Sequence, residues 1–185
     1  MKYSNLIISG VPKSFRVDRA VDLVQPLADD ARPEDVLFDM YPAECDGESG
    51  EEEACVMFKY DESATGVEVV HSPHLQALSV GLPPWASDAD VQLFASFVNA
   101  FLAKHKRARL YEGAAPLGGL SDDDVRQMIE ERRAYLAELL STQESITMEG
   151  LRASATLGVA EFRAAVAPDQ QVCELQRQFI EMQWK

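Results

Sequence analysis

The stretch that most constrains the fold runs from Leu75 to Gly113, because every local signal in it agrees on a strand, a turn, a helix and a second strand. In its first part, residues 75–82, large apolar and small side chains alternate from Leu78 onward, which is the period-two pattern of a strand with one apolar face. Pro83 and Pro84 end this strand because a proline cannot donate a hydrogen bond to a sheet ladder.

A long helix is predicted to begin after Ser87, which lies three residues before Asp90 in the arrangement of a capping box. Apolar residues then recur at the i, i+3, i+4, i+7 spacing of one buried helix face: Val91, Phe94, Ala95, Val98, Phe101 and Leu102. The positive residues of 104–107 suit the negative end of the helix dipole. Arg109–Tyr111 is predicted to be a short strand.

The segments before this stretch indicate an antiparallel meander. Short strands are predicted over residues 5–9, 36–41, 54–60, 66–71 and 75–82, with a short helix over 17–24. Consecutive short strands favour antiparallel pairing over a doubly wound sheet. Because Leu6, Ile7 and Ile8 follow one another, the first strand is predicted to be buried on both faces.

The C-terminal third adds helices. Residues 113–120 are predicted to be a loop, and a second long helix begins at Ser121 with the same capping device, completed by Asp124. Its apolar face is Val125, Met128, Ile129, Arg132 through its aliphatic stem, Tyr135, Leu136, Leu139 and Leu140. Residues 145–149 are predicted to be a strand, and residues 153–162 a second extended piece.

The predicted fold class is therefore α+β, in a single domain over residues 1–185. An antiparallel sheet of five to seven strands carries two long helices on one face, with a C-terminal helical extension over about 169–184. That last helix has an apolar face, so it must dock on the body of the protein or on a partner.

Charge narrows the classes of partner. The chain has 17 Lys and Arg residues against 31 Asp and Glu residues, which gives a formal net charge of −14. Such a field disfavours nucleic acid and anionic membranes and favours a basic protein partner, although a local basic patch is compatible with it. The simpler alternative is that acidity serves solubility alone.

Localisation is predicted to be cytoplasmic. The three cysteines have no regular spacing, which argues against a disulfide framework and for a reducing compartment. The N-terminal apolar patch is too short for a signal peptide, and no apolar run approaches a membrane span.

No motif for catalysis or for a cofactor is present. There is no G-x-S-x-G elbow, and the Gly118-Gly119 pair precedes three aspartates rather than the Lys and Ser or Thr of a phosphate loop. The acidic segment of residues 44–53 lacks the residue order of an EF-hand. His71 and His74 have a spacing that two metal ligands can use, but Pro73 between them favours a turn, and no metal is predicted.

Two classes of function remain. The first is a non-enzymatic binding module that meets a basic protein partner through an acidic surface, and a homodimer is also possible. The residues predicted to form that surface are Glu44, Asp46, Glu48, Glu51, Glu52, Glu53, Trp85, Asp122 and Asp123. Trp85 is either an exposed anchor or a hydrophobic staple on the helix that follows it. The alternative is a small hydrolase-like enzyme built from His71, His74 and nearby carboxylates.

In size, acidity and lack of a catalytic signature the chain resembles bacterial immunity proteins, which neutralise a toxin by binding it. The resemblance rests on no shared motif, and it transfers no residue role. It implies a protein partner with a basic surface.

Overall fold

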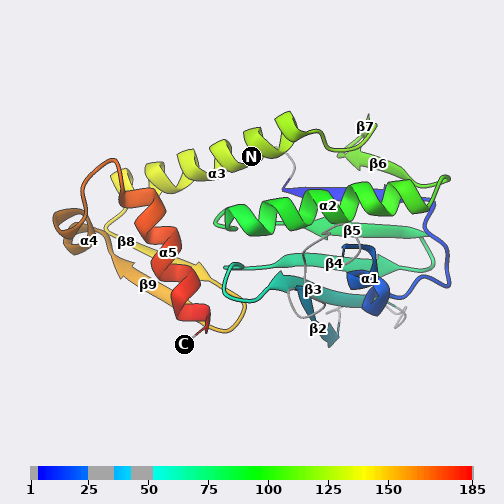
Figure 1. Ribbon diagram of the computed structural model, residues 1–185, viewed down its shortest axis with the longest axis horizontal. Helices are drawn as coiled ribbons and strands as arrows, with labels where there is room; N and C mark the ends of the chain where they lie inside the picture. The colour runs from blue at the N-terminus through cyan, green and yellow to red at the C-terminus, as the bar shows by residue number, and fades with distance from the viewer. Residues whose placement is uncertain (1–3, 25–35, 43–51, 185) are drawn as a thin grey trace.

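The structure is a computed structural model that describes residues 4–24, 36–42 and 52–184 (Figure 1). The described strands are β1 (Asn5–Ser9), β2 (Val36–Pro42), β3 (Glu53–Lys59), β4 (Val67–Ser72), β5 (Ala77–Gly81), β6 (Arg109–Glu112), β7 (Ala115–Leu117), β8 (Ser145–Glu149) and β9 (Ser154–Gly158). The described helices are the 3-10 helix η1 (Val17–Arg19) and α1 (Val21–Val24), α2 (Asp88–Lys104), α3 (Asp122–Thr142), α4 (Val159–Ala165) and α5 (Gln171–Trp184).

The α+β prediction is confirmed. Seven strands form an antiparallel sheet in the order β2-β3-β4-β5-β1-β6-β7, and β8 pairs with β9 in a separate two-stranded sheet. Helix α2 runs across one face of the large sheet, with α3 beside it (Figure 1). Strand β7 falls within the predicted loop 113–120, and α4 begins within the predicted extended piece 153–162.

Helices cover the large sheet on one face, and this corrects the prediction for the first strand. Leu6 and Ile8 of β1 are fully buried in the core under α2, whereas Ile7 between them is 38% exposed. Alternate side chains of a strand point to opposite faces, so a strand in a sheet covered on one side buries only every second residue. The prediction that β1 is buried on both faces was therefore wrong.

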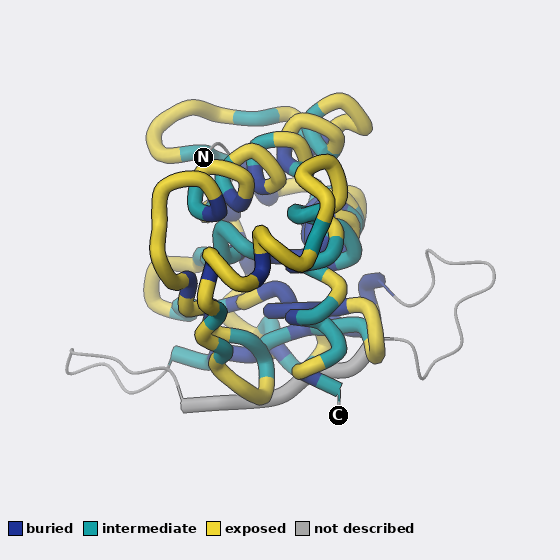
Figure 2. Tube along the Cα trace, turned by 90° about the vertical axis from the view of Figure 1, so that its left-hand side faces the viewer, coloured by how far each residue is buried: buried dark blue, intermediate teal, exposed yellow. Residues whose placement is uncertain are grey.

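Within the described part of the chain the buried residues form two cores, and α3 contributes to both. Met128, near its start, belongs to the core between the large sheet and α2, while Leu136 and Leu140 belong to a second core with β8, β9, α4 and α5. In the side view of Figure 2, buried positions recur at intervals along the helices, as expected for elements with one inward face.

Arg132 lies on α3 between these two sets of core residues. Its side chain was predicted to bury only its stem, but the residue is 1% exposed. Its Nη1 donates to the carbonyl of Met128 at 3.2 Å, and its Nε and Nη2 have no partner among the described residues. Burial lowers the pKa of Arg132 to about 10, against the opposing effects of Glu131 and Asp90.

Asp90 joins the start of α2 to the turn between β3 and β4. The predicted capping box is present, with the Ser87 hydroxyl accepting from the Asp90 amide. The fully buried Asp90 carboxylate also accepts from the backbone amides of Ala64 at 3.1 Å, Thr65 at 3.2 Å, Gly66 at 3.0 Å and Ser87 at 2.9 Å. One buried carboxylate therefore satisfies donors from two distant segments, which compensates for its own desolvation.

The same turn, residues 61–66, receives the C-terminal part of the chain. Trp184 at the end of α5 donates from Nε1 to the carbonyl of Ser63 at 3.0 Å, and its ring lies 4.7 Å from that of Tyr60. Leu151, in the turn between β8 and β9, donates to the carbonyl of Ala64 at 3.3 Å. The C-terminal helix thus docks on the body of its own chain.

We expect Asp90→Ala to lower the free energy of unfolding by about 3–5 kcal/mol, because several buried donors lose their shared acceptor. Asp124 occupies the same capping-box position in α3, but the hydrogen bonds it accepts from Ser121 are exposed. Asp124→Ala is therefore a matched control that should cost about 1 kcal/mol. Urea unfolding of both variants measures the difference, and equal losses would contradict the central role of Asp90.

Candidate functional site

The predicted acidic surface is described only in part. Glu44, Asp46, Glu48 and Glu51 lie outside the described residues. Glu52 and Glu53 both accept hydrogen bonds within the fold. The Ser72 hydroxyl donates to Glu52 at 2.5 Å, and the backbone amide of Val17 donates to Glu53 at 3.4 Å.

Asp122 and Asp123 lie at the start of α3, just after β7, and Asp123 pairs with Arg126 at 3.1 Å. In the large sheet, β7 and β3 are separated by four other strands, a distance of about 24 Å at the usual spacing. The structure therefore does not bring Asp122 and Asp123 together with Glu52 and Glu53.

Trp85 lies in the link between β5 and α2 and is half-buried. Its side chain packs against the second core, whereas Val91, in the first turn of α2, belongs to the first core. Its Nε1 donates to the carbonyl of Glu149 at 2.7 Å. Trp85 thereby holds the end of β8 next to the large sheet.

A cleft of about 410 Å³ opens where the β8–β9 turn meets the face of the large sheet that no described helix covers, called here the uncovered face. Val56 of β3, Glu68 of β4 and Gly81 of β5 line it from the sheet, and Glu149 and Gly150 line it from the turn. We call it the outer cleft. It contains two carboxylates, Glu68 and Glu149, and its position follows from the contact that Trp85 makes with β8.

Local backbone chemistry shapes the outer cleft. Gly66 has a φ of +70°, and a Cβ there would lie 2.5 Å from Val56 Cγ1 and 2.7 Å from the Met57 carbonyl, so only glycine fits. Gly81 pairs with Glu68 across β4 and β5, and a Cβ on Gly81 would lie 3.3 Å from Glu68 Oε2. The missing side chain at Gly81 thus leaves room for the Glu68 carboxylate to lie across β5.

Sequence reasoning missed this cleft. The available signal was a single Glu68 in the otherwise apolar strand sequence VEVVHS, which marks an outward-facing position. The pairing of Glu68 with Gly81 and the approach of Glu149 depend on register and on the docking of the hairpin, which local patterns do not specify.

His71 and His74 do not converge. His71 lies on the core face of β4, fully buried, with its ring edge-on to Phe15 at 5.6 Å, whereas His74 is exposed in the turn after β4. Neither histidine lines the outer cleft. Among the described residues, no group of three or more His, Cys, Asp or Glu side chains is arranged to hold a metal ion.

Protonation of His71 destabilises the folded state. Both ring nitrogens lack a hydrogen-bond partner among the described residues, and burial lowers the pKa of His71 below 6.5, with Glu53 opposing the shift. Because the folded-state pKa is the lower one, the unfolded chain binds the proton first as pH falls. Stability associated with His71 is present above pH 6.5 and is lost as pH falls below it.

We therefore expect His71→Phe to reduce the loss of unfolding free energy between pH 7 and pH 5.5, because a neutral ring replaces a buried titrating one. The pKa of His105 is also lowered, but that group is the same in both proteins, so their difference reports His71 alone. His74→Asn is the control and should keep the wild-type pH dependence. An unchanged slope in His71→Phe would contradict this description of His71.

Comparison with known proteins adds no assignment: no protein-family model, curated protein or solved structure matches the chain. The described helices include none that is both long and apolar enough to cross a membrane.

Proposed function

We propose that this protein is a non-enzymatic binding module that holds a basic protein partner through an acidic surface. The single observation that carries the proposal is the outer cleft, in which Glu68 and Glu149 face solvent on a chain of net charge −14. A lysine or arginine side chain is the complementary group for two neighbouring carboxylates.

The surroundings of the cleft support a protein rather than a free cation as the ligand. The uncovered sheet face next to it carries the exposed Ile7 and the half-buried Val70 and Tyr111. These three residues lie in one row across the paired strands β4, β5, β1 and β6. Apolar groups beside a charged cleft match the usual anatomy of an interface, with an apolar centre and charged groups at its rim.

The long-range field supports rapid association with such a partner. An excess of acidic groups steers a basic protein towards the surface and speeds encounter, and salt screens the effect. A toxin neutralised by an immunity protein is one kind of partner that meets this description. Residues 44–53 contribute six of the 31 acidic residues to that net charge.

The test is affinity capture at low salt from the cells that produce the protein. We expect a basic protein in stoichiometric amount that is released as ionic strength rises. The double variant Glu68→Lys/Glu149→Lys should weaken its binding at least tenfold, a loss of about 1.4 kcal/mol. Titration calorimetry with the purified partner measures the change.

The matched control is Glu138→Lys/Glu161→Lys, which makes the same change in net charge at exposed positions on α3 and α4. It should retain most of the affinity, since its charges lie away from the cleft. Recovery of no stoichiometric partner would contradict the proposed function. Equal binding by both double variants would contradict the assignment of the cleft alone.

A further inference from the structure

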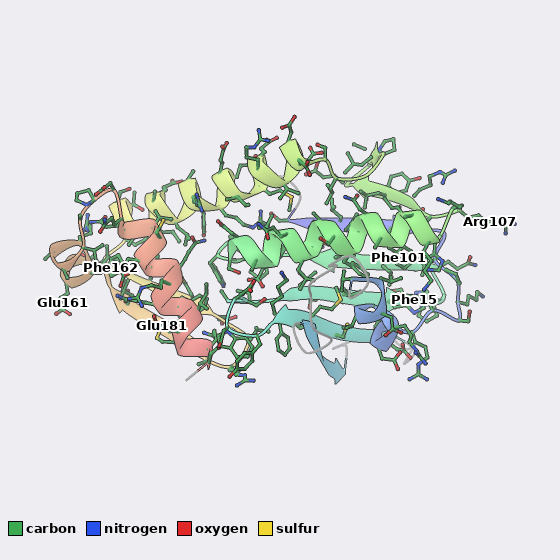
Figure 3. The ribbon with its side chains drawn as sticks, viewed as in Figure 1. Phe15, Phe101, Arg107, Glu161, Phe162 and Glu181 are labelled. Atoms are coloured by element: carbon green, nitrogen blue, oxygen red, sulfur yellow. The ribbon has the colours of Figure 1, made fainter. Side chains whose placement is uncertain are left out.

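A strongly basic end stands out on this acidic protein. Residues 13–19 and 104–109 hold seven of the 17 Lys and Arg residues and only one of the 31 Asp and Glu residues. The rest of the chain has 10 basic and 30 acidic residues, of which Asp22 pairs with Arg19 and Glu53 accepts from the Val17 amide. The segments meet in space, because the rings of Phe15 and His105 lie 6.2 Å apart. Figure 3 shows Phe15, Phe101 and Arg107 together at this end of the molecule.

A cavity of about 300 Å³ lies between these two segments, and we call it the basic cavity. Pro12, Phe15 and Leu23 give it an apolar wall, and Arg16, Arg19 and Lys104 give it positive charge. The Phe15 ring is held edge-on to Phe101 at 5.2 Å, so the wall is anchored in the main core. The cavity lies on α2 and η1, away from the strands that line the outer cleft.

The charges of the cavity favour an anion. Arg16 pairs with Asp18 and Arg19 with Asp22, each at 3.2 Å, but Lys104 forms no ion pair with any described residue. The negative end of the α2 dipole, worth about half a charge, opposes an anion here. It is outweighed by the three full positive charges of residues 104–107.

The volume of the cavity and the negative charge of the surrounding surface favour a small ligand. The volume is at the lower end of the range for small-molecule sites, about 300–1,000 Å³. An extended polyanion would have to pass the acidic remainder of the surface, where repulsion acts over a screening length of about 8 Å. A phosphate monoester carries up to two negative charges near neutral pH, which suits a site with two arginines and a lysine.

We propose that the basic cavity binds a small organic phosphate, whose phosphate group contacts Lys104, Arg16 and Arg19 and whose apolar body lies against Phe15 and Leu23. This site is independent of the proposed binding of a basic partner, because its ligand has the opposite charge and its residues are different.

The experiment titrates the full-length protein with phenyl phosphate, inorganic phosphate and phenol at constant pH. Calorimetry gives the affinity, and the NMR signal of the His105 ring, assigned by its loss in His105→Asn, gives the location. We expect phenyl phosphate to bind at least fivefold more tightly than either inorganic phosphate or phenol and to shift the His105 signal. Lys104→Glu should weaken phenyl phosphate at least tenfold.

Arg126→Glu is the control, because it makes the same change in net charge at an exposed arginine on α3. It should bind phenyl phosphate within about twofold of the wild type, since salt screens distant charges. The proposal is overturned if phenyl phosphate does not bind at 10 mM, if Lys104→Glu binds it as the wild type does, or if inorganic phosphate binds equally well. It is also overturned if a hexaglutamate peptide displaces phenyl phosphate with higher affinity, which would assign the cavity to an acidic peptide.

Discussion

The buried carboxylate of Asp90 is the interaction on which the rest of this structure depends. It binds the backbone amides of residues 64–66 to the start of α2, although the two segments are about 25 residues apart in the chain. The turn that it holds then receives Trp184 and Leu151 from the C-terminal part. A buried charge is tolerated only when its hydrogen bonds are satisfied, so the position of the turn is closely specified.

The position of that turn explains how the outer cleft forms. The large sheet and the β8–β9 hairpin belong to different cores. They meet because the turn and Trp85 hold Glu149 near β4 and β5. The basic cavity forms at the other end of α2, where the helix meets η1. The two proposed sites, of opposite charge, therefore lie near opposite ends of α2.

Local patterns in the sequence predicted most of the fold and little of the site. The capping boxes at Ser87 and Ser121 were predictable because their partners lie three residues away. The exposure of Ile7 was not, because it depends on which sheet face the helices cover. The sequence showed Glu68 as a lone charge in an apolar strand, but its neighbours Gly81 and Glu149 are brought to it by strand pairing and hairpin docking.

By itself, the sequence determined the class of the fold, the order of most of its elements, the acidic field and the faces of the long helices. These depend on composition and on contacts within a few residues. Tertiary structure alone decided that Asp90 is a buried acceptor for a distant turn rather than only a cap, and that the whole Arg132 side chain is buried. It also decided that Arg16, Arg19 and Lys104 line one cavity. Those outcomes require residues far apart in the chain to meet, and no local pattern encodes such contacts.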